Sequence, residues 1–147
     1  MEFYTSQEVA EQTEVPYRTL MRWVKQGLID PTVPGRRGRQ TLFTKEEFRE
    51  VAILAKLRKF LSVKQLREAL NYLRSLGHNP LSEGDFAIVR DIRGERALFK
   101  ICKEGDVIKV MEEEPGQLRL FPIYDVEELI KEAAPIRKSS EQGYWTD

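Results

Sequence analysis

The stretch VPYRTLMRWVKQGLIDPTVPGRRGRQTLF, from Val15 to Phe43, gathers positive charge in a chain whose net charge is zero. Its only acidic residue is Asp30, whereas its basic residues are Arg18, Arg22, Lys25, Arg36, Arg37 and Arg39. A local excess of arginine in a neutral protein indicates a surface that meets a negatively charged partner. Where each arginine lies in the fold decides whether they can meet the same partner.

The first half of this stretch has the pattern of a short helix that follows a tight turn. Pro16 is tolerated at the first position of a helix, and Gly27 is a typical residue just past the end of one. Another helix is predicted over about residues 6–12, and the connection over residues 13–15 is about as long as a helix-turn-helix requires. We therefore predict a helix-turn-helix whose second helix covers residues 16–26.

The second half, PTVPGRRGRQTLF (residues 31–43, the wing), contains two prolines, two glycines and three arginines. Proline and glycine interrupt regular structure and favour turns. We predict a hairpin or extended loop with a glycine at its tip. No packing requirement explains three arginines in such a loop, so the wing arginines favour a role in binding.

Three helix starts are predicted by capping boxes, in which a Ser or Thr and a Glu or Gln three residues later satisfy each other's backbone N–H groups. The pairs are Thr5 with Glu8, Thr44 with Glu47, and Ser62 with Gln65. Each pair stands before an apolar periodic run, which strengthens the assignment. They predict the helix over residues 6–12 and two more over about residues 45–60 and 63–76.

Arg18 and Arg22 are four residues apart and therefore share one face of the predicted helix, beside Tyr17. Leu20 and Val24 take the opposite side, where they can pack on neighbouring helices. Taken alone, a charged helix face is usually a solvated surface. The wing arginines favour DNA instead, because a recognition helix in the major groove needs basic loop residues on the neighbouring phosphates. Arginine can also bind phosphate or guanine through two hydrogen bonds.

After residue 77 both the periodicity and the charge change. Residues 1–77 carry 14 Lys/Arg against 9 Asp/Glu, and residues 78–147 carry 10 against 15. Four short runs, DFAIVRD, ALFKICK, DVIKVME and QLRLFPI, are separated by turn signals and predict a small antiparallel β-meander. DVEELIKEA then predicts a C-terminal helix, with an apolar side made by Val126, Leu129 and Ile130.

The predicted fold class is α+β, divided into three segments. Residues 1–78 are expected to form the winged helix-turn-helix DNA-binding domain, residues 79–134 a small β-rich domain for dimerisation or partner binding, and residues 135–147 a mobile tail. Operators with two half-sites need a dimer. Edge strands of the meander, or the apolar side of the last helix, could join two copies. We therefore expect a homodimer formed through residues 79–134.

About residues 3–77 resemble the MerR-type winged helix-turn-helix. The resemblance is carried by the stretch YTSQEVAEQTEVPYRTLMRWVKQGLIDP, the Gly/Arg-rich segment after it, and the stretch LFTKEEFREVAILAKLRKFLSVKQLREAL. The part RTLMRWVKQG resembles the excisionase-like branch equally well. The resemblance implies a second helix in the major groove and a wing on the DNA backbone. The residues it places on DNA are Tyr17, Arg18, Thr19 and Arg22, with Arg36, Arg37 and Arg39 on the wing; Lys25 completes the basic surface.

The sequence departs from that family after residue 77, where the long dimerising coiled-coil helix has no counterpart. The cysteines of the family's metal sensors are also absent, so metal sensing is not supported. The second half loosely resembles regions that follow a MerR-like domain in antitoxins of PIN-nuclease toxin–antitoxin pairs. The alternative function is therefore an antitoxin that masks a PIN-type toxin and regulates its own operon.

Cys102 is the only cysteine and His78 the only histidine, which leaves few groups for a catalytic triad or a zinc site. We expect no enzyme activity, no cofactor and no metal. One cysteine excludes a disulfide within the chain, which suits a reducing cytoplasm. No run is long and apolar enough to cross a bilayer, and the N-terminus lacks the pattern of a secretory signal. The expectation is a cytoplasmic, prokaryotic-type regulator that binds double-stranded DNA.

Overall fold

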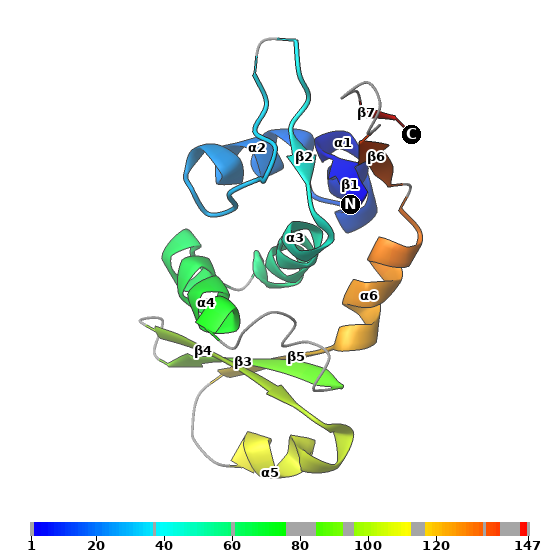
Figure 1. Ribbon diagram of the computed structural model, residues 1–147. Coiled ribbons are helices and arrows are strands. Elements are labelled where there is room, and N and C mark those ends of the chain that lie inside the picture. The colour runs from blue at the N-terminus through cyan, green and yellow to red at the C-terminus, as the bar shows by residue number, and fades with distance from the viewer. Residues whose placement is uncertain are drawn as a thin grey trace. The chain divides into compact units, whose positions relative to one another are not determined.

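A computed structural model describes residues 2–36, 38–59, 61–75, 85–92, 96–112, 117–133, 135–138 and 145–146. The chain divides into two compact units. The first unit combines Met1–Ala55 with Glu127–Asp147, and the second is Lys56–Val126. Figure 1 shows the order of the elements along the chain. Helices and strands occur in both units, which confirms the α+β class; the predicted domain boundaries stay a prediction.

The helix-turn-helix lies in the first unit and consists of α1 (Ser6–Thr13) and α2 (Tyr17–Lys25). The Oγ1 atom of Thr5 accepts a hydrogen bond of 3.1 Å from the backbone N–H of Glu8, so the predicted cap of α1 is present. Pro16 stands just before α2 with an extended backbone. The two helices therefore begin and end within about one residue of the predicted positions.

Two complete capping boxes start the next helices, α3 (Lys45–Leu57) and α4 (Val63–Ser75). Thr44 and Glu47 exchange hydrogen bonds of 3.2 and 2.9 Å. Ser62 and Gln65 do the same at 3.2 and 2.9 Å. Each box satisfies backbone N–H groups that the first turn of a helix leaves without an intrahelical partner. Both predicted starts are confirmed.

A small antiparallel sheet in the first unit has the strand order β2-β1-β6-β7. β1 (Glu2–Thr5) pairs with β2 (Leu42–Phe43) and also with β6 (Ile136–Lys138). β7 (Trp145–Thr146) pairs with β6. Residues 136–138, predicted to belong to a mobile tail, thus form a strand beside the N-terminal strand.

The core of the first unit forms where α1, α2 and α3 bury their apolar sides. Tyr4 from β1 meets Phe48 from α3 edge to face, with ring centroids 5.0 Å apart. Burial raises the pKa of the Tyr4 hydroxyl, the charge of Glu2 raises it further, and Arg49 lowers it. The other core residues include Val9, Leu20, Trp23, Leu28, Ile29, Leu42, Phe43, Val51, Ala52 and Leu54.

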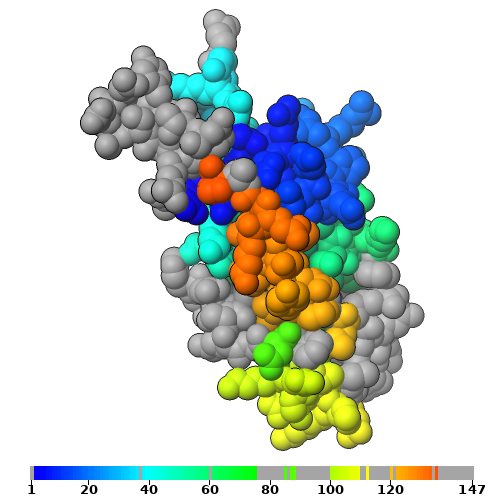
Figure 2. Space-filling view, turned by 90° about the vertical axis from the view of Figure 1, so that its right-hand side faces the viewer, coloured from blue at the N-terminus to red at the C-terminus, as the bar shows by residue number. Residues whose placement is uncertain are grey.

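The second unit contains a three-stranded antiparallel sheet of β3 (Phe86–Ile92), β4 (Arg96–Cys102) and β5 (Gln117–Pro122). Helix α4 packs against β4. The short helix α5 (Val107–Glu112) follows the 3₁₀ turn η2 (Glu104–Asp106). Figure 1 shows α4 and α5 on opposite faces of the sheet, and Figure 2 shows α5 at the surface. α6 (Ile123–Lys131) comes directly after β5.

The small antiparallel sheet is confirmed, but two details of the prediction are wrong. The run DVIKVME forms a helix rather than a strand, because Val107 packs on Ile88 and Cys102 and short apolar runs fit either period. The strand order is β4-β3-β5, so β5 pairs with β3 and the sheet is not a simple meander. The segment that contains α5 connects β4 to β5, and β5 pairs with the edge of β3 opposite to β4.

The apolar side of the last helix is also used differently from the prediction. Val126 and Ile130 are buried within the chain, and Leu129 is half-buried. A side that is already covered cannot serve as a docking stripe for a second copy. The prediction that α6 offers such a stripe is therefore wrong.

Candidate nucleic-acid interface

Helix α2 has one face in the core and the other in solvent. Leu20 and Trp23 are almost completely buried, whereas Tyr17, Arg18 and Arg22 are exposed. Residues three and four apart lie on the same side of a helix, so this burial pattern fixes which side faces outward. The buried leucine and indole hold the helix, and both arginines project from the uncovered side.

The end of α2 is set by two backbone hydrogen bonds around Gly27. The N–H of Leu28 donates to the carbonyl of Trp23 at 3.0 Å, and the N–H of Gly27 donates to that of Val24 at 3.1 Å. Gly27 has a φ of 74°, which is the left-handed conformation that this C-terminal motif requires. The predicted role of Gly27 is confirmed. The buried Leu28 that follows fixes where the chain leaves the helix.

The turn between α1 and α2 uses the same left-handed motif at the end of a helix, but with Glu14 in the position that glycine usually takes. Glu14 has a φ of 57°, and it is the one residue other than glycine with a positive φ in the part of the chain that the structure describes. Its N–H donates to the carbonyl of Glu11 at 3.3 Å, and the N–H of Val15 donates to that of Ala10 at 3.1 Å. Val15 is the next residue of the turn, and its buried side chain holds the turn between α1 and α2.

The wing is a hairpin, the first of the two predicted alternatives. Val33 and Leu42 exchange backbone hydrogen bonds of 3.4 and 2.8 Å, and Arg36 and Arg39 exchange bonds of 3.3 and 2.7 Å. Gly38 lies in the turn between them with a φ of 75°. Figure 1 shows the hairpin projecting beyond α2 and β2.

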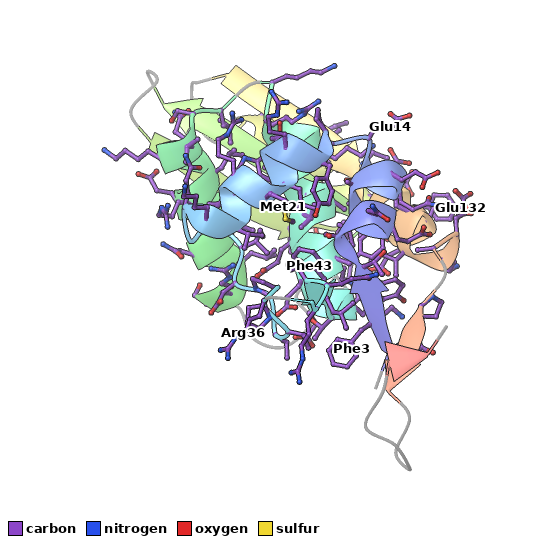
Figure 3. The ribbon with its side chains drawn as sticks, turned by 90° about the horizontal axis from the view of Figure 1, so that it is seen from above. Phe3, Glu14, Met21, Arg36, Phe43 and Glu132 are labelled. Atoms are coloured by element: carbon purple, nitrogen blue, oxygen red, sulfur yellow. The ribbon has the colours of Figure 1, made fainter. Side chains whose placement is uncertain are left out.

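The predicted DNA-binding residues lie on two neighbouring parts of the first unit. The exposed ones are Tyr17, Arg18, Arg22 and Lys25 on α2, with Arg36 and Arg39 on the wing; Thr19 is half-buried. Figure 3 shows the Arg36 side chain pointing away from the helices. Arg37 and His78 lie outside the described residues.

No described carboxylate forms an ion pair with Arg18, Arg22, Arg36 or Arg39. The hydrogen-bond donors of these guanidinium groups are therefore available for another molecule. Arg49 differs from them, because its partly buried side chain is paired with the carboxylate of Glu127. The arrangement is suited to binding an extended anion such as a nucleic-acid strand.

Glu47 is a residue of this region that sequence reasoning recognised only as a helix cap. Its carboxylate also accepts hydrogen bonds from Thr32 in the wing, at 3.0 Å from the backbone N–H and at 2.8 Å from the hydroxyl. The capping pattern gave no sign of this contact, because Thr32 lies 15 residues earlier in the chain.

Arg49 and Glu127 form a second long-range pair that the sequence did not reveal. The Nε and Nη2 atoms of Arg49 donate to the two carboxylate oxygens of Glu127 at 2.7 and 3.3 Å. Both side chains are partly buried, which reduces screening by water and salt. The pair joins α3 to α6 within the first unit.

Among the described residues, no group of three or more His, Cys, Asp or Glu side chains is placed to hold a metal ion. Cys102 is buried, and that burial raises the pKa of its thiol, with Asp106 adding to the shift. None of the helices in the described ranges has the length and apolar character needed to cross a membrane.

The match to a protein family covers this same region. Residues 4–73 match the model of the MerR HTH family regulatory proteins. The matched segment is therefore similar to a MerR-type helix-turn-helix. The match confirms the resemblance seen in the sequence and supports a DNA-binding transcription regulator. It ends within α4, before the sheet of the second unit. A search of curated proteins finds no match to the chain.

Proposed function

We propose that the protein is a sequence-specific regulator of transcription that binds double-stranded DNA through α2 and the wing. The observation that carries the proposal is the set of exposed, unpaired arginines on two adjacent parts of a MerR-type segment. The buried side of α2 fixes its orientation, so its outer side can enter a groove as a rigid body. A regulator of this kind is expected in the cytoplasm and needs no catalytic residues.

The two parts carry different tasks in this proposal. α2 lies in the major groove, with Arg18 and Arg22 at base edges and Tyr17 and Thr19 beside them. Arginine reads guanine through a two-point contact with its O6 and N7 atoms, which gives sequence discrimination. Arg36, Arg37 and Arg39 of the wing bind phosphates. Phosphate contacts fix register and orientation but carry no sequence information directly. Lys25 adds charge near the end of α2.

We also propose that two copies pair through residues 79–134. MerR-type regulators are usually dimers, and an operator with two half-sites requires two-fold symmetry. Two features of the second unit support this surface. β4 and β5 each pair only with β3 among the described strands, and Ile108, Leu120 and Tyr124 are 71, 45 and 65% exposed. Exposed apolar side chains beside open strand edges are typical of association surfaces.

The alternative, an antitoxin that masks a PIN-type toxin, stays a prediction from sequence. The family match ends at residue 73 and carries no information about the segment that would meet a toxin.

The function is tested by a nuclease footprint of the protein on the DNA around its own gene. We expect protection of two half-sites whose centres are separated by about 10 base pairs or a multiple of that. Excess random-sequence duplex should leave the protection in place, because base contacts add affinity beyond the phosphate contacts. Absence of any site that survives this competition would contradict sequence-specific binding.

The dimer is tested by light scattering on the full chain. We expect a mass twice that of the 17.2 kDa chain at micromolar concentration. Ile108→Asp should shift the protein toward the monomer, because it places a charge in the apolar contact. Val63→Asp is the matched control, since Val63 is an exposed apolar residue at the start of α4. A wild-type monomer at this concentration would contradict the dimer.

A further inference from the structure

We propose that Glu47 is a positioning residue for the wing: one carboxylate holds both ends of the hairpin and so determines where the wing arginines meet DNA. The inference rests on the proposed function and deepens it, because Glu47 itself does not touch DNA in this account. It assigns to α3 an influence on binding that the family match does not specify.

The carboxylate lies at the point where the two legs of the wing leave the body of the first unit. Thr32 directly precedes Val33, the first residue of the hairpin pairs, and Thr44 directly follows the last residue of β2. The Oε1 atom of Glu47 accepts from the backbone N–H groups of Thr32 and Thr44 at 3.0 and 2.9 Å. The Oε2 atom accepts from the Thr32 hydroxyl at 2.8 Å.

A helix cap alone does not account for this arrangement. The capping box explains the bonds between Glu47 and Thr44, which start α3. It does not require the two bonds to Thr32, which join the first leg of the wing to the same carboxylate. Because hydrogen bonds to an ionised acceptor are stronger than neutral ones, these contacts limit how far the first leg can swing.

The described residues of the hairpin show few other constraints on its direction. Its legs are joined to each other by the Val33–Leu42 and Arg36–Arg39 pairs, and β2 is joined to β1. Pairs between the legs keep the hairpin intact but do not fix its angle to α2. The second leg is held by β1, whereas the first leg is held at its base by Glu47. Loss of the carboxylate should therefore leave a formed hairpin with a less defined direction.

Whether removing the Glu47 carboxylate strengthens or weakens DNA binding distinguishes a positioning role from a purely electrostatic one. Removing a carboxylate near a DNA-binding surface should strengthen binding if only Coulomb attraction matters. Loss of positioning should weaken it, because the wing arginines no longer meet phosphates in register with α2. Glu47→Ala is therefore expected to weaken binding by roughly 2- to 30-fold, the range seen for residues that act without touching the ligand.

The experiment measures DNA affinity and its salt dependence for the full chain by fluorescence anisotropy. In Glu47→Ala the slope of log K against log salt should become shallower by up to about 2. Each of the two described wing arginines, Arg36 and Arg39, contributes about 1 if it loses its phosphate contact. Glu47→Gln should retain nearly wild-type binding, since its Oε1 atom can accept both N–H bonds and its amide can donate to the Thr32 hydroxyl. Glu46→Gln, which removes a charge from the same exposed turn, is the matched control.

A double-mutant cycle completes the test. In a background with Arg36, Arg37 and Arg39 replaced by Ala, Glu47→Ala should have almost no further effect on affinity, because the wing arginines that it positions are gone. An unchanged slope in Glu47→Ala, or an equal loss in both backgrounds, would overturn the proposal. If Glu47→Ala does not fold, Thr32→Val replaces it, because it removes one bond to the wing and leaves the capping box intact.

Failure of this inference is distinguishable from failure of the proposed function. Wild-type protein that binds DNA and weakens on loss of Arg36 and Arg39, with no coupling to Glu47, contradicts only the positioning role. Wild-type protein that binds no duplex contradicts the proposed function itself.

Discussion

Helix α2 and the wing both carry exposed arginines, but different contacts hold each of them in the fold. α2 is fixed by buried residues, Leu20 and Trp23, and by the hydrogen-bonded motif at Gly27. The wing buries little beyond its base and is held by backbone pairs and by Glu47. Contacts to base edges read the sequence and suit the rigid support of α2, whereas the phosphate contacts of the wing fix register and orientation. The difference in support therefore corresponds to the difference in the proposed tasks.

The largest expected effect concerns the support of α2. Trp23→Ala removes a buried indole and should lower the free energy of unfolding by about 3–5 kcal/mol. Chemical denaturation measures this change. Tyr17→Ala, on the exposed side of the same helix, should stay within about 0.5 kcal/mol of wild type. Equal losses from the two substitutions would mean that the helix is not held by its buried side.

The second prediction separates base reading from phosphate binding. Arg22→Ala should cost about 1–3 kcal/mol of binding free energy on the operator and relax the preference for one base pair. Arg39→Ala should weaken the operator and random duplex alike. Anisotropy titrations on both duplexes measure the two effects. Non-selective losses from both variants would show that α2 does not read bases.

The smallest effect concerns the turn that presents α2. Glu14 has a φ that L-residues adopt at a cost, so Glu14→Gly should raise the free energy of unfolding by about 0.5–1 kcal/mol. Glu11→Gly, at an exposed position inside α1, should lower it by about 1 kcal/mol. Thermal melts compare the pair. A loss of stability in both variants would indicate that the Glu14 side chain, and not its backbone, matters to the turn.

The parts of the fold that were predicted correctly are encoded over a few residues. Capping boxes span four positions, a helix stop needs one glycine, and a hairpin tip needs a glycine between extended legs. Thr44, Ser62 and Gly27 therefore act as expected. The exposure of Arg18 and Arg22 also follows from helical period alone.

The parts that were missed depend on residues far apart in the chain. The Glu47–Thr32 contact spans 15 residues and the Arg49–Glu127 pair spans 78, and no local pattern specifies either. DVIKVME is short enough to fit a strand or a helix, and its contact with Ile88 and Cys102 decides between them. The partner of β5 and the burial of Val126 are likewise set by packing.

The central claim is that the exposed arginines of α2 and the wing meet DNA together. It is tested most directly by the salt dependence of duplex binding, followed by anisotropy between about 50 and 200 mM salt. The three wing arginines on phosphates predict a slope of log K against log salt of roughly −3 per protomer, at about 0.9 for each phosphate contact. The variant with Arg18, Arg22, Arg36, Arg37 and Arg39 replaced by Ala should approach a flat line. A flat line for the wild-type protein would contradict the account.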